Sequence, residues 1–137
     1  MASSHPISVA IIGTGLIGPR HAQAVVGDPD AVLSCMVDPN PAAGEVAKSF
    51  NVPFFRSVHE MLASGSRPAA AIVCTPNHTH VAVSKQLLDG GVHVLVEKPI
   101  SVDIPSGQEL VHLTLSLLSN CSFCSVILLN ILEPDCS

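Results

Sequence analysis

Basic residues are scarce in this sequence. Its 137 residues include six Lys or Arg against eleven Asp or Glu, which gives a formal net charge of -5 at pH 7. A protein that follows a nucleic-acid backbone needs a surface rich in cations. The composition therefore excludes nucleic acid as an expected partner, and the length favours one domain of ordinary size with its own apolar core.

Signals for secretion and for paired-cysteine chemistry are also missing. The N-terminus, MASSHPISVAIIG, has no basic segment before its first apolar run, which argues against a signal peptide. The five cysteines are odd in number, and Cys35 and Cys74 lie in apolar runs where a free thiol behaves as a small hydrophobe. The pair Cys121 and Cys124 has no second pair, so neither zinc binding nor dithiol redox chemistry is supported. We predict a cytoplasmic protein.

The C-terminal part lacks positive charge altogether, because no Lys or Arg follows Lys98. Its stretch 113–132 is uncharged and about as long as the roughly 20 residues that cross a bilayer. Ser, Thr and Asn interrupt this stretch, and no basic residue flanks it to set an orientation, so a membrane span is disfavoured. If exposed, an apolar run of this length is a surface for interaction or aggregation.

Hydrophobic periodicity alternates along the first hundred residues. Short runs rich in β-branched residues alternate with segments of helical spacing, and Ser57 and Glu60 form an S-x-x-E capping box. This order predicts a doubly wound α/β fold with a mostly parallel sheet. The expected strands are 7–12, 31–37, 52–55, 69–74 and 92–96, and the expected helices are 16–26, 40–50, 57–65 and 78–88. After Pro99 the pattern is weaker and indicates a helix over 104–113 and a sixth strand over 125–130.

A glycine-rich turn joins the first strand to the first helix. GTGLIG matches G-x-G-x-x-G, and Asp38 stands 20 residues after Gly18 at the end of the second strand. The first glycine permits a tight turn, the second lets the backbone approach a pyrophosphate, and the third lets helix and strand pack closely. We therefore predict a dinucleotide site that includes the whole turn: Gly13, Thr14, Gly15, Leu16, Ile17 and Gly18.

Asp38 decides the expected cofactor. Its carboxylate would accept hydrogen bonds from both hydroxyls of the adenosine ribose and repel a 2'-phosphate, which favours NAD over NADP. The residues that follow, DPNPAAGE, offer no Arg or Lys for such a phosphate. An alternative is that Asp38 only caps the helix that begins near Pro41, and the two roles are compatible.

The segment CTPNHTH follows the fourth strand, at the edge of the sheet where ligands bind in open α/β folds. Pro76 and Asn77 also suit a turn and a helix cap without any ligand. His78 and His80 are two positions apart, so on a helix they point in different directions and no metal site is expected. His21 and His59 fall on predicted helices and are interpreted as solvated or packed.

Three stretches together carry a resemblance to a known family: VAIIGTGLIGPRHAQAV, VDPNP, and VCTPNHTHVAVSKQLLDGGVHVLVEKPIS. In this order they resemble the nucleotide-binding half of the Gfo/Idh/MocA family, named after glucose-fructose oxidoreductase, inositol dehydrogenase and MocA. The match covers residues 7 to about 111. It implies an NAD(P)-dependent oxidoreductase that acts on a sugar, cyclitol or related polyol.

The resemblance also assigns roles to residues after the fourth and fifth strands. Lys98 would lie beside the nicotinamide and assist proton transfer, Glu97 would help to hold the nicotinamide ribose, and Pro99 would follow a cis peptide bond. A solvated lysine at a strand end is the alternative for Lys98. Four further positions match residues that line the cofactor in the family: Thr75, Pro76, Asn77 and His80.

The sequence departs from the family after about residue 112. Family members continue into a second α/β domain that supplies most of the substrate pocket and builds the oligomer, and nothing of it is present here. We therefore predict a Rossmann domain over 1–111, an atypical apolar tail over 112–137, and a truncated chain. Half a cleft positions a substrate poorly, so an active dehydrogenase is disfavoured for this chain alone. An NAD-binding module without catalysis and a partner protein that docks through the tail remain the alternatives.

Overall fold

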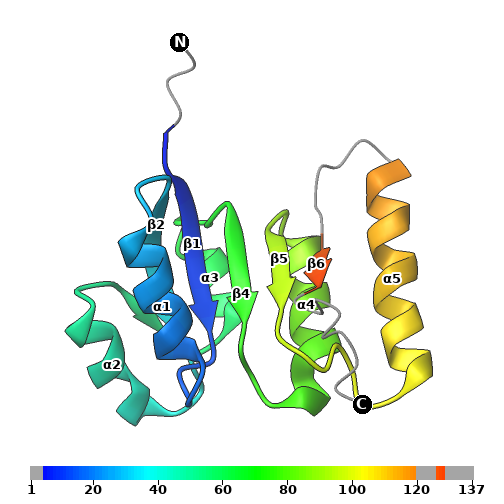
Figure 1. Ribbon diagram of the computed structural model, residues 1–137, viewed down its shortest axis with the longest axis horizontal. Coiled ribbons are helices and arrows are strands. Elements are labelled where there is room, and N and C mark those ends of the chain that lie inside the picture. The colour runs from blue at the N-terminus through cyan, green and yellow to red at the C-terminus, as the bar shows by residue number, and fades with distance from the viewer. Residues whose placement is uncertain (1–4, 120–125, 129–137) are drawn as a thin grey trace, which may run out of the picture.

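The computed structural model describes residues 5–119 and 126–128 and shows an α/β domain (Figure 1). Six strands form one sheet in the order β3-β2-β1-β4-β5-β6, and every neighbouring pair is parallel. The predicted doubly wound fold is confirmed. The strands are β1 (Ile7–Ile12), β2 (Ala31–Val37), β3 (Phe54–Phe55), β4 (Ala70–Val73), β5 (His93–Val96) and β6 (Val126–Leu128). The helices are α1 (Gly18–Gly27), α2 (Gly44–Ser49), α3 (Val58–Ala63), α4 (His80–Asp89) and α5 (Ile104–Ser119).

Two apolar layers sandwich the sheet because neighbouring residues of each strand point to opposite faces. In β1, Val9 and Ile11 belong to the layer that includes α1 and α2, represented by the buried Ala22 and Ala47. Ala10 and Ile12 belong to the opposite layer, which includes residues of α3, α4 and α5. Strands buried on both faces explain why the sequence shows continuous apolar runs rather than a strict alternation.

Helix α3 begins close to where the capping box predicts. The Ser57 hydroxyl accepts a hydrogen bond from the Glu60 amide at 3.1 Å, as a capping residue does. The Glu60 carboxylate, however, accepts from the Arg56 amide at 2.6 Å instead of from the Ser57 amide. One half of the predicted box is therefore confirmed, and the other half is displaced by one residue.

Other boundaries move by a few residues. Helix α1 begins at Gly18 rather than at residue 16, because the backbone of 13–17 forms the glycine turn. Helix α5 runs to Ser119 and so crosses the predicted boundary between 111 and 112, which stays a prediction. Strand β6 occupies part of the predicted sixth strand and pairs with β5. The Cys121–Cys124 pair lies outside the described residues.

Among the described residues, no helix combines the length and the apolar character that are needed to cross a bilayer. The uncharged stretch 113–132 begins within α5. This helix contributes Leu113 and Leu117 of the stretch, both half-buried, and the preceding, fully buried Leu110 to the core. The packed face of α5 therefore explains some of the apolar character of this segment.

Candidate functional site

The ends of four strands lie side by side at one edge of the sheet. The register pairs residues of neighbouring strands at the same level, namely Ile12, Val37, Val73 and Val96. The hydrogen-bond ladder continues for one more residue, with Gly13 N donating to Val37 O at 2.7 Å and Cys74 N to Ile12 O at 2.7 Å. The next residues along each strand therefore form a row: Gly13, Asp38, Cys74 and Glu97.

This row lies where the strand order of the sheet reverses, between β1 and β4. The chain moves outward from β1 to β2 and β3, then returns to β4 on the other side of β1. The arrowheads of β1, β4 and β5 point to the same lower edge in Figure 1. In open parallel sheets the crevice at such a reversal, beside the carboxyl ends of the strands, is the usual ligand site. Local motifs far apart in the sequence meet there because of the strand order.

The three glycines of the turn differ in what surrounds them. Gly13 has φ +94° and lies so close to the β4 chain that an added Cβ would be 2.8 Å from the Cys74 carbonyl. A Cβ on Gly18 would be 2.1 Å from the Gly13 carbonyl oxygen. Gly15, in contrast, is exposed and has no heavy atom within 4 Å of such a Cβ. The fold itself requires Gly13 and Gly18, whereas only an approaching ligand would require Gly15.

The Asp38 side chain is hydrogen-bonded to the glycine turn. Its Oδ2 accepts hydrogen bonds from both the amide and the hydroxyl of Thr14, each at 2.9 Å. Its Oδ1 accepts from the Asn40 amide at 2.9 Å. The Asn40 side chain in turn caps the short 3₁₀ turn Pro41–Ala43 by accepting from the Ala42 amide. Capping is therefore the role of Asn40, and Asp38 joins the end of β2 to the turn after β1.

The N-terminus of α1 is open. No side chain caps it and its first turn carries no acidic residue, although Pro19 suits the first turn. Helix N-termini of this kind attract phosphate groups through unpaired amides and the helix dipole. The predicted turn residues Leu16 and Ile17 are 80% and 36% exposed, respectively, which leaves two large apolar side chains at the tip of the turn.

A cleft of about 630 Å³ opens beside this turn. Its wall includes five predicted cofactor residues, namely Gly13, Gly15, Asp38, Thr75 and Pro76. It also includes groups that sequence reasoning missed, among them Pro39, Arg56, Cys74, Val83 and Gln86. These come from the ends of β2, β3 and β4 and from α4, which converge only through the strand order.

Arg56 brings a positive charge to the end of the cleft that holds Asp38. The Arg56 Nε donates to the Pro39 carbonyl at 2.9 Å, and Nη2 donates to the same oxygen. This pairing fixes the exposed guanidinium beside the residue that follows Asp38. No motif indicates this contact, because Arg56 follows β3 and lies 17 positions from Pro39.

Cys74 supplies an uncharged part of the wall. Burial, with a smaller contribution from the Glu97 carboxylate, raises the pKa of the Cys74 thiol to about 12. The side chain is therefore protonated at neutral pH, and a thiolate nucleophile is not available there.

The loop after β4 contains both exposed and buried members of the predicted set. Asn77 is exposed, as is His78, whereas His80 is only 1% exposed. The Thr79 hydroxyl bonds the Thr75 hydroxyl and the Pro76 carbonyl, each at 2.7 Å, which closes the loop on itself. His80 is buried and is not among the residues of the cleft wall, and its expected contact with the cofactor stays a prediction.

Glu97 and Lys98 lie at the next strand end. Glu97 is paired with His21 of α1, a histidine whose helix position alone indicates a solvated or packed residue. The other carboxylate oxygen of Glu97 accepts from the Lys98 amide at 3.2 Å. The Lys98 side chain is exposed, and the peptide bond between Lys98 and Pro99 is cis, as the resemblance implies. The one sequence signal for the His21–Glu97 pair is the position of His21 shortly after the glycine motif.

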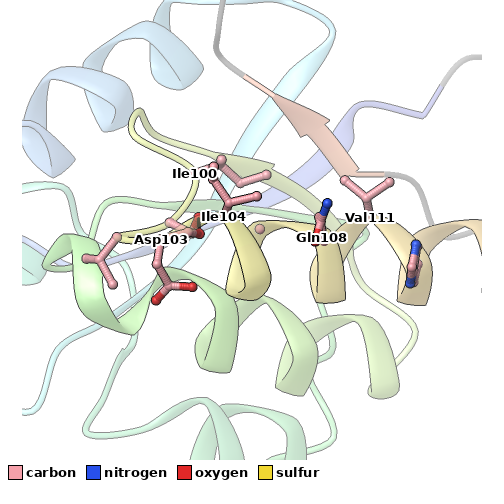
Figure 2. Close-up of a pocket in the computed structure, with 9 residues that line it drawn as sticks. Ile100, Asp103, Ile104, Gln108 and Val111 are labelled. Atoms are coloured by element: carbon pink, nitrogen blue, oxygen red, sulfur yellow. Dashed lines mark hydrogen bonds between the residues drawn. The ribbon is translucent and has the colours of Figure 1, made fainter.

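A second hollow of about 520 Å³ lies along the N-terminal half of α5. Figure 2 shows Ile104, Gln108 and Val111 on this helix, with Ile100 and Asp103 on the segment before it. Its wall is mainly apolar. Within the described residues, no group of three or more His, Cys, Asp or Glu side chains could hold a metal ion there or elsewhere.

Comparison with known proteins identifies the domain. The Gfo/Idh/MocA pattern, described as an oxidoreductase family with an NAD-binding Rossmann fold, matches residues 7–117. Inositol 2-dehydrogenase of Rhizobium meliloti (strain 1021) is 32% identical over 97 residues, which cover 71% of this chain and 29% of that protein. UDP-N-acetylglucosamine 3-dehydrogenase of Acidithiobacillus ferrooxidans is 33% identical over 114 residues, which cover 78% of this chain and 35% of that protein.

Solved structures agree with this relationship. The crystal structure of GenD2 from gentamicin A biosynthesis, in complex with NAD, superposes with a TM-score of 0.79 at 26% identity. The match covers 90% of this chain and 34% of GenD2, so the chain spans about a third of the length of the proteins it matches. The sequence match and the fold around the glycine turn show that the chain belongs to the Gfo/Idh/MocA oxidoreductase family, as its NAD-binding Rossmann domain.

Proposed function

We propose that the chain binds NAD(H) across the row of strand ends, with the adenosine in the cleft beside Asp38 and the pyrophosphate on the glycine turn. The observation that carries this proposal is the contrast among the glycines. Backbone contacts of the fold explain Gly13 and Gly18, while Gly15 borders the cleft with open space around it. A glycine that the fold does not need is explained by close approach of a ligand to the backbone.

We further propose that NAD is preferred over NADP. Asp38 faces the cleft, and Thr14 already occupies both acceptor positions of its Oδ2, so Oδ1 is the oxygen with capacity left for a ribose hydroxyl. A 2'-phosphate at that hydroxyl would meet the carboxylate charge. Arg56 lies at the same end of the cleft and reduces this repulsion, but its bonds to Pro39 hold it in place.

Titration of the purified chain with NADH and with NADPH tests both statements. We expect NADH to bind about tenfold more tightly than NADPH, which corresponds to about 1.4 kcal/mol. This is less than the full repulsion between close like charges near a protein surface, because Arg56 offsets part of it. Asp38→Asn removes the charge and should bring the two affinities closer together. Fluorescence or calorimetric titration gives both dissociation constants.

Asp28→Asn is the matched control for this substitution. Asp28 makes the same type of side-chain contact, accepting from the amide two residues later at 2.8 Å, but it lies at the end of α1 before β2. It should leave both affinities unchanged. Equal affinities for NADH and NADPH in the unsubstituted chain would mean that Arg56 fully offsets the charge of Asp38 and would refute the preference. Failure to bind either nucleotide would refute the site itself.

We also propose that these residues form the cofactor half of a dehydrogenase that acts on a ring hydroxyl of a sugar, inositol or related polyol. The names of the two relatives above support this class of substrate. NAD, when bound, supplies the hydride acceptor, and Lys98 at the end of β5 is the residue of this chain proposed to take up the hydroxyl proton. Assayed alone with a panel of polyols, the chain is expected to bind NADH without turnover.

A further inference from the structure

His80 connects two motifs that the sequence presents separately. It lies at the N-terminus of α4, and its imidazole is 1% exposed. One ring nitrogen, Nδ1, is 2.7 Å from the Pro99 carbonyl oxygen, and the other, Nε2, is 2.8 Å from the Thr75 carbonyl oxygen. The ring therefore spans the loop after β4 and the turn after β5.

Both partners are carbonyl oxygens, which only accept hydrogen bonds. A neutral imidazole has one N–H and satisfies one of them, while the doubly protonated ring satisfies both. The nitrogen that carries the proton is the donor, so the bond to the Pro99 carbonyl requires the proton on Nδ1. A buried donor and two backbone acceptors held at hydrogen-bond distance form a rigid contact, since losing it leaves polar groups unpaired.

The turn after β5 is held on its strand side at Glu97, which pairs with His21 and whose amide donates to the Val73 carbonyl at 3.1 Å. Two further bonds are local. The Lys98 amide donates to the adjacent Glu97 side chain, and the Ser101 hydroxyl donates to the Asp103 carbonyl at 2.6 Å. The bond from His80 reaches the carbonyl of the residue that directly follows Lys98. It is thus a link from α4 to the short segment that carries the lysine.

We infer that His80 is a positioning residue, which holds Lys98 in place relative to the cofactor cleft by bonding the Pro99 carbonyl. This inference rests on the proposed function, because it assumes that Lys98 faces a bound nucleotide. It differs from the role expected from the sequence, in which His80 lines the cofactor. The T-P-N-x-x-H and E-K-P motifs are then two parts of one unit, joined through this ring.

The chain suits a direct test because it has three lysines, Lys48, Lys85 and Lys98. Reductive methylation with ¹³C-formaldehyde gives each lysine its own NMR resonance, which Lys98→Arg assigns. Lys48 and Lys85 are paired with Glu45 and Glu109 and serve as internal references. In the methylated chain without any substitution, saturating NADH should shift the Lys98 resonance and leave the resonances of Lys48 and Lys85 in place.

His80→Leu should bind NADH but lose the NADH-induced shift of the Lys98 resonance. His78→Leu is the matched control, since it makes the same change at an exposed histidine two positions earlier, and it should keep the shift. His80→Gln, which retains an amide NH₂ as a donor group, should keep part of the shift. It replaces His80→Leu if that variant does not fold.

The outcomes separate the two proposals. Absence of NADH binding in the unmodified chain would refute the proposed function. Binding with a Lys98 shift that is the same in His80→Leu as in the unmodified chain would overturn the positioning role alone. Binding without any movement of the Lys98 resonance in the unmodified chain would also overturn it, because the lysine would then lie away from the nucleotide.

Discussion

Gly13→Ala should lower the free energy of unfolding by about 3–5 kcal/mol, near the upper limit for a single substitution. The new Cβ would be 2.8 Å from both the carbonyl carbon and oxygen of Cys74 and 2.9 Å from the Thr75 amide nitrogen. These atoms are backbone at the end of a central strand and have little room to move. The positive φ of Gly13 adds roughly 1–2 kcal/mol of strain for a residue with a side chain. Urea denaturation followed by circular dichroism measures the difference.

Gly65→Ala is the control that separates strain from clash. Gly65 also has a positive φ, +80°, but nothing lies within 4 Å of an added Cβ. Its alanine variant should therefore lose only about 1 kcal/mol, the contribution of the backbone conformation. Equal losses in the two variants would mean that β1 and β4 do not approach each other as closely at the cleft as the structure indicates.

Gly15→Ala should have the opposite profile, a stable fold with weakened NADH binding. Nothing in the fold contacts the added methyl group, so the midpoint of thermal unfolding should stay the same or rise slightly. At the cleft, however, the methyl group would stand where a pyrophosphate approaches the backbone. We expect the dissociation constant for NADH to increase at least about tenfold, which corresponds to about 1.4 kcal/mol. Calorimetric titration and a thermal melt of the same sample measure both quantities.

Gly27→Ala provides the comparison for this variant. Gly27 ends α1 and likewise has nothing within 4 Å of an added Cβ, but it is not part of the cleft wall. It should change neither the melting temperature nor the NADH affinity to any large extent. Unchanged NADH affinity in Gly15→Ala would contradict the placement of the pyrophosphate on this turn.

The fold was readable from the sequence because its signals are local. Continuous apolar runs such as 7–12 and 31–37 predict strands buried on both faces, and the intervening helical spacing predicts crossovers. Strands joined by helices must be parallel, and parallel strands place their carboxyl ends at one edge. The positions of Gly13 and Asp38 at that edge follow from these rules, and their register in the structure agrees.

The contacts within the site were not readable, because they depend on which strands become neighbours. His21 and Glu97 are 76 positions apart, and they meet because the start of α1 and the end of β5 lie at the same edge of the sheet. Arg56 enters the cleft because β3 pairs with β2 and ends beside Pro39. A residue-by-residue pattern contains no information on such pairings.

His80 shows a different limit of sequence reasoning. Its motif position implies a cofactor contact, which stays a prediction, whereas its burial depends on how its helix begins. A 3₁₀ turn over Asn77–Thr79 precedes α4 and leaves Asn77 and His78 exposed while His80 is buried. Helix boundaries are uncertain by a few residues from sequence alone, and one such difference reverses the direction of a side chain.

Chemical-shift mapping of NADH on the backbone amides of the ¹⁵N-labelled chain locates the dinucleotide site directly. We expect the largest chemical-shift changes on the glycine turn 13–18, on Asp38 and on the loop 74–77. The amino ends of the strands, represented by Ala31, Ala70 and His93, should show little change because they lie at the opposite edge of the sheet. Changes centred on those amino ends, or none at saturating NADH, would contradict a dinucleotide site at the carboxyl edge.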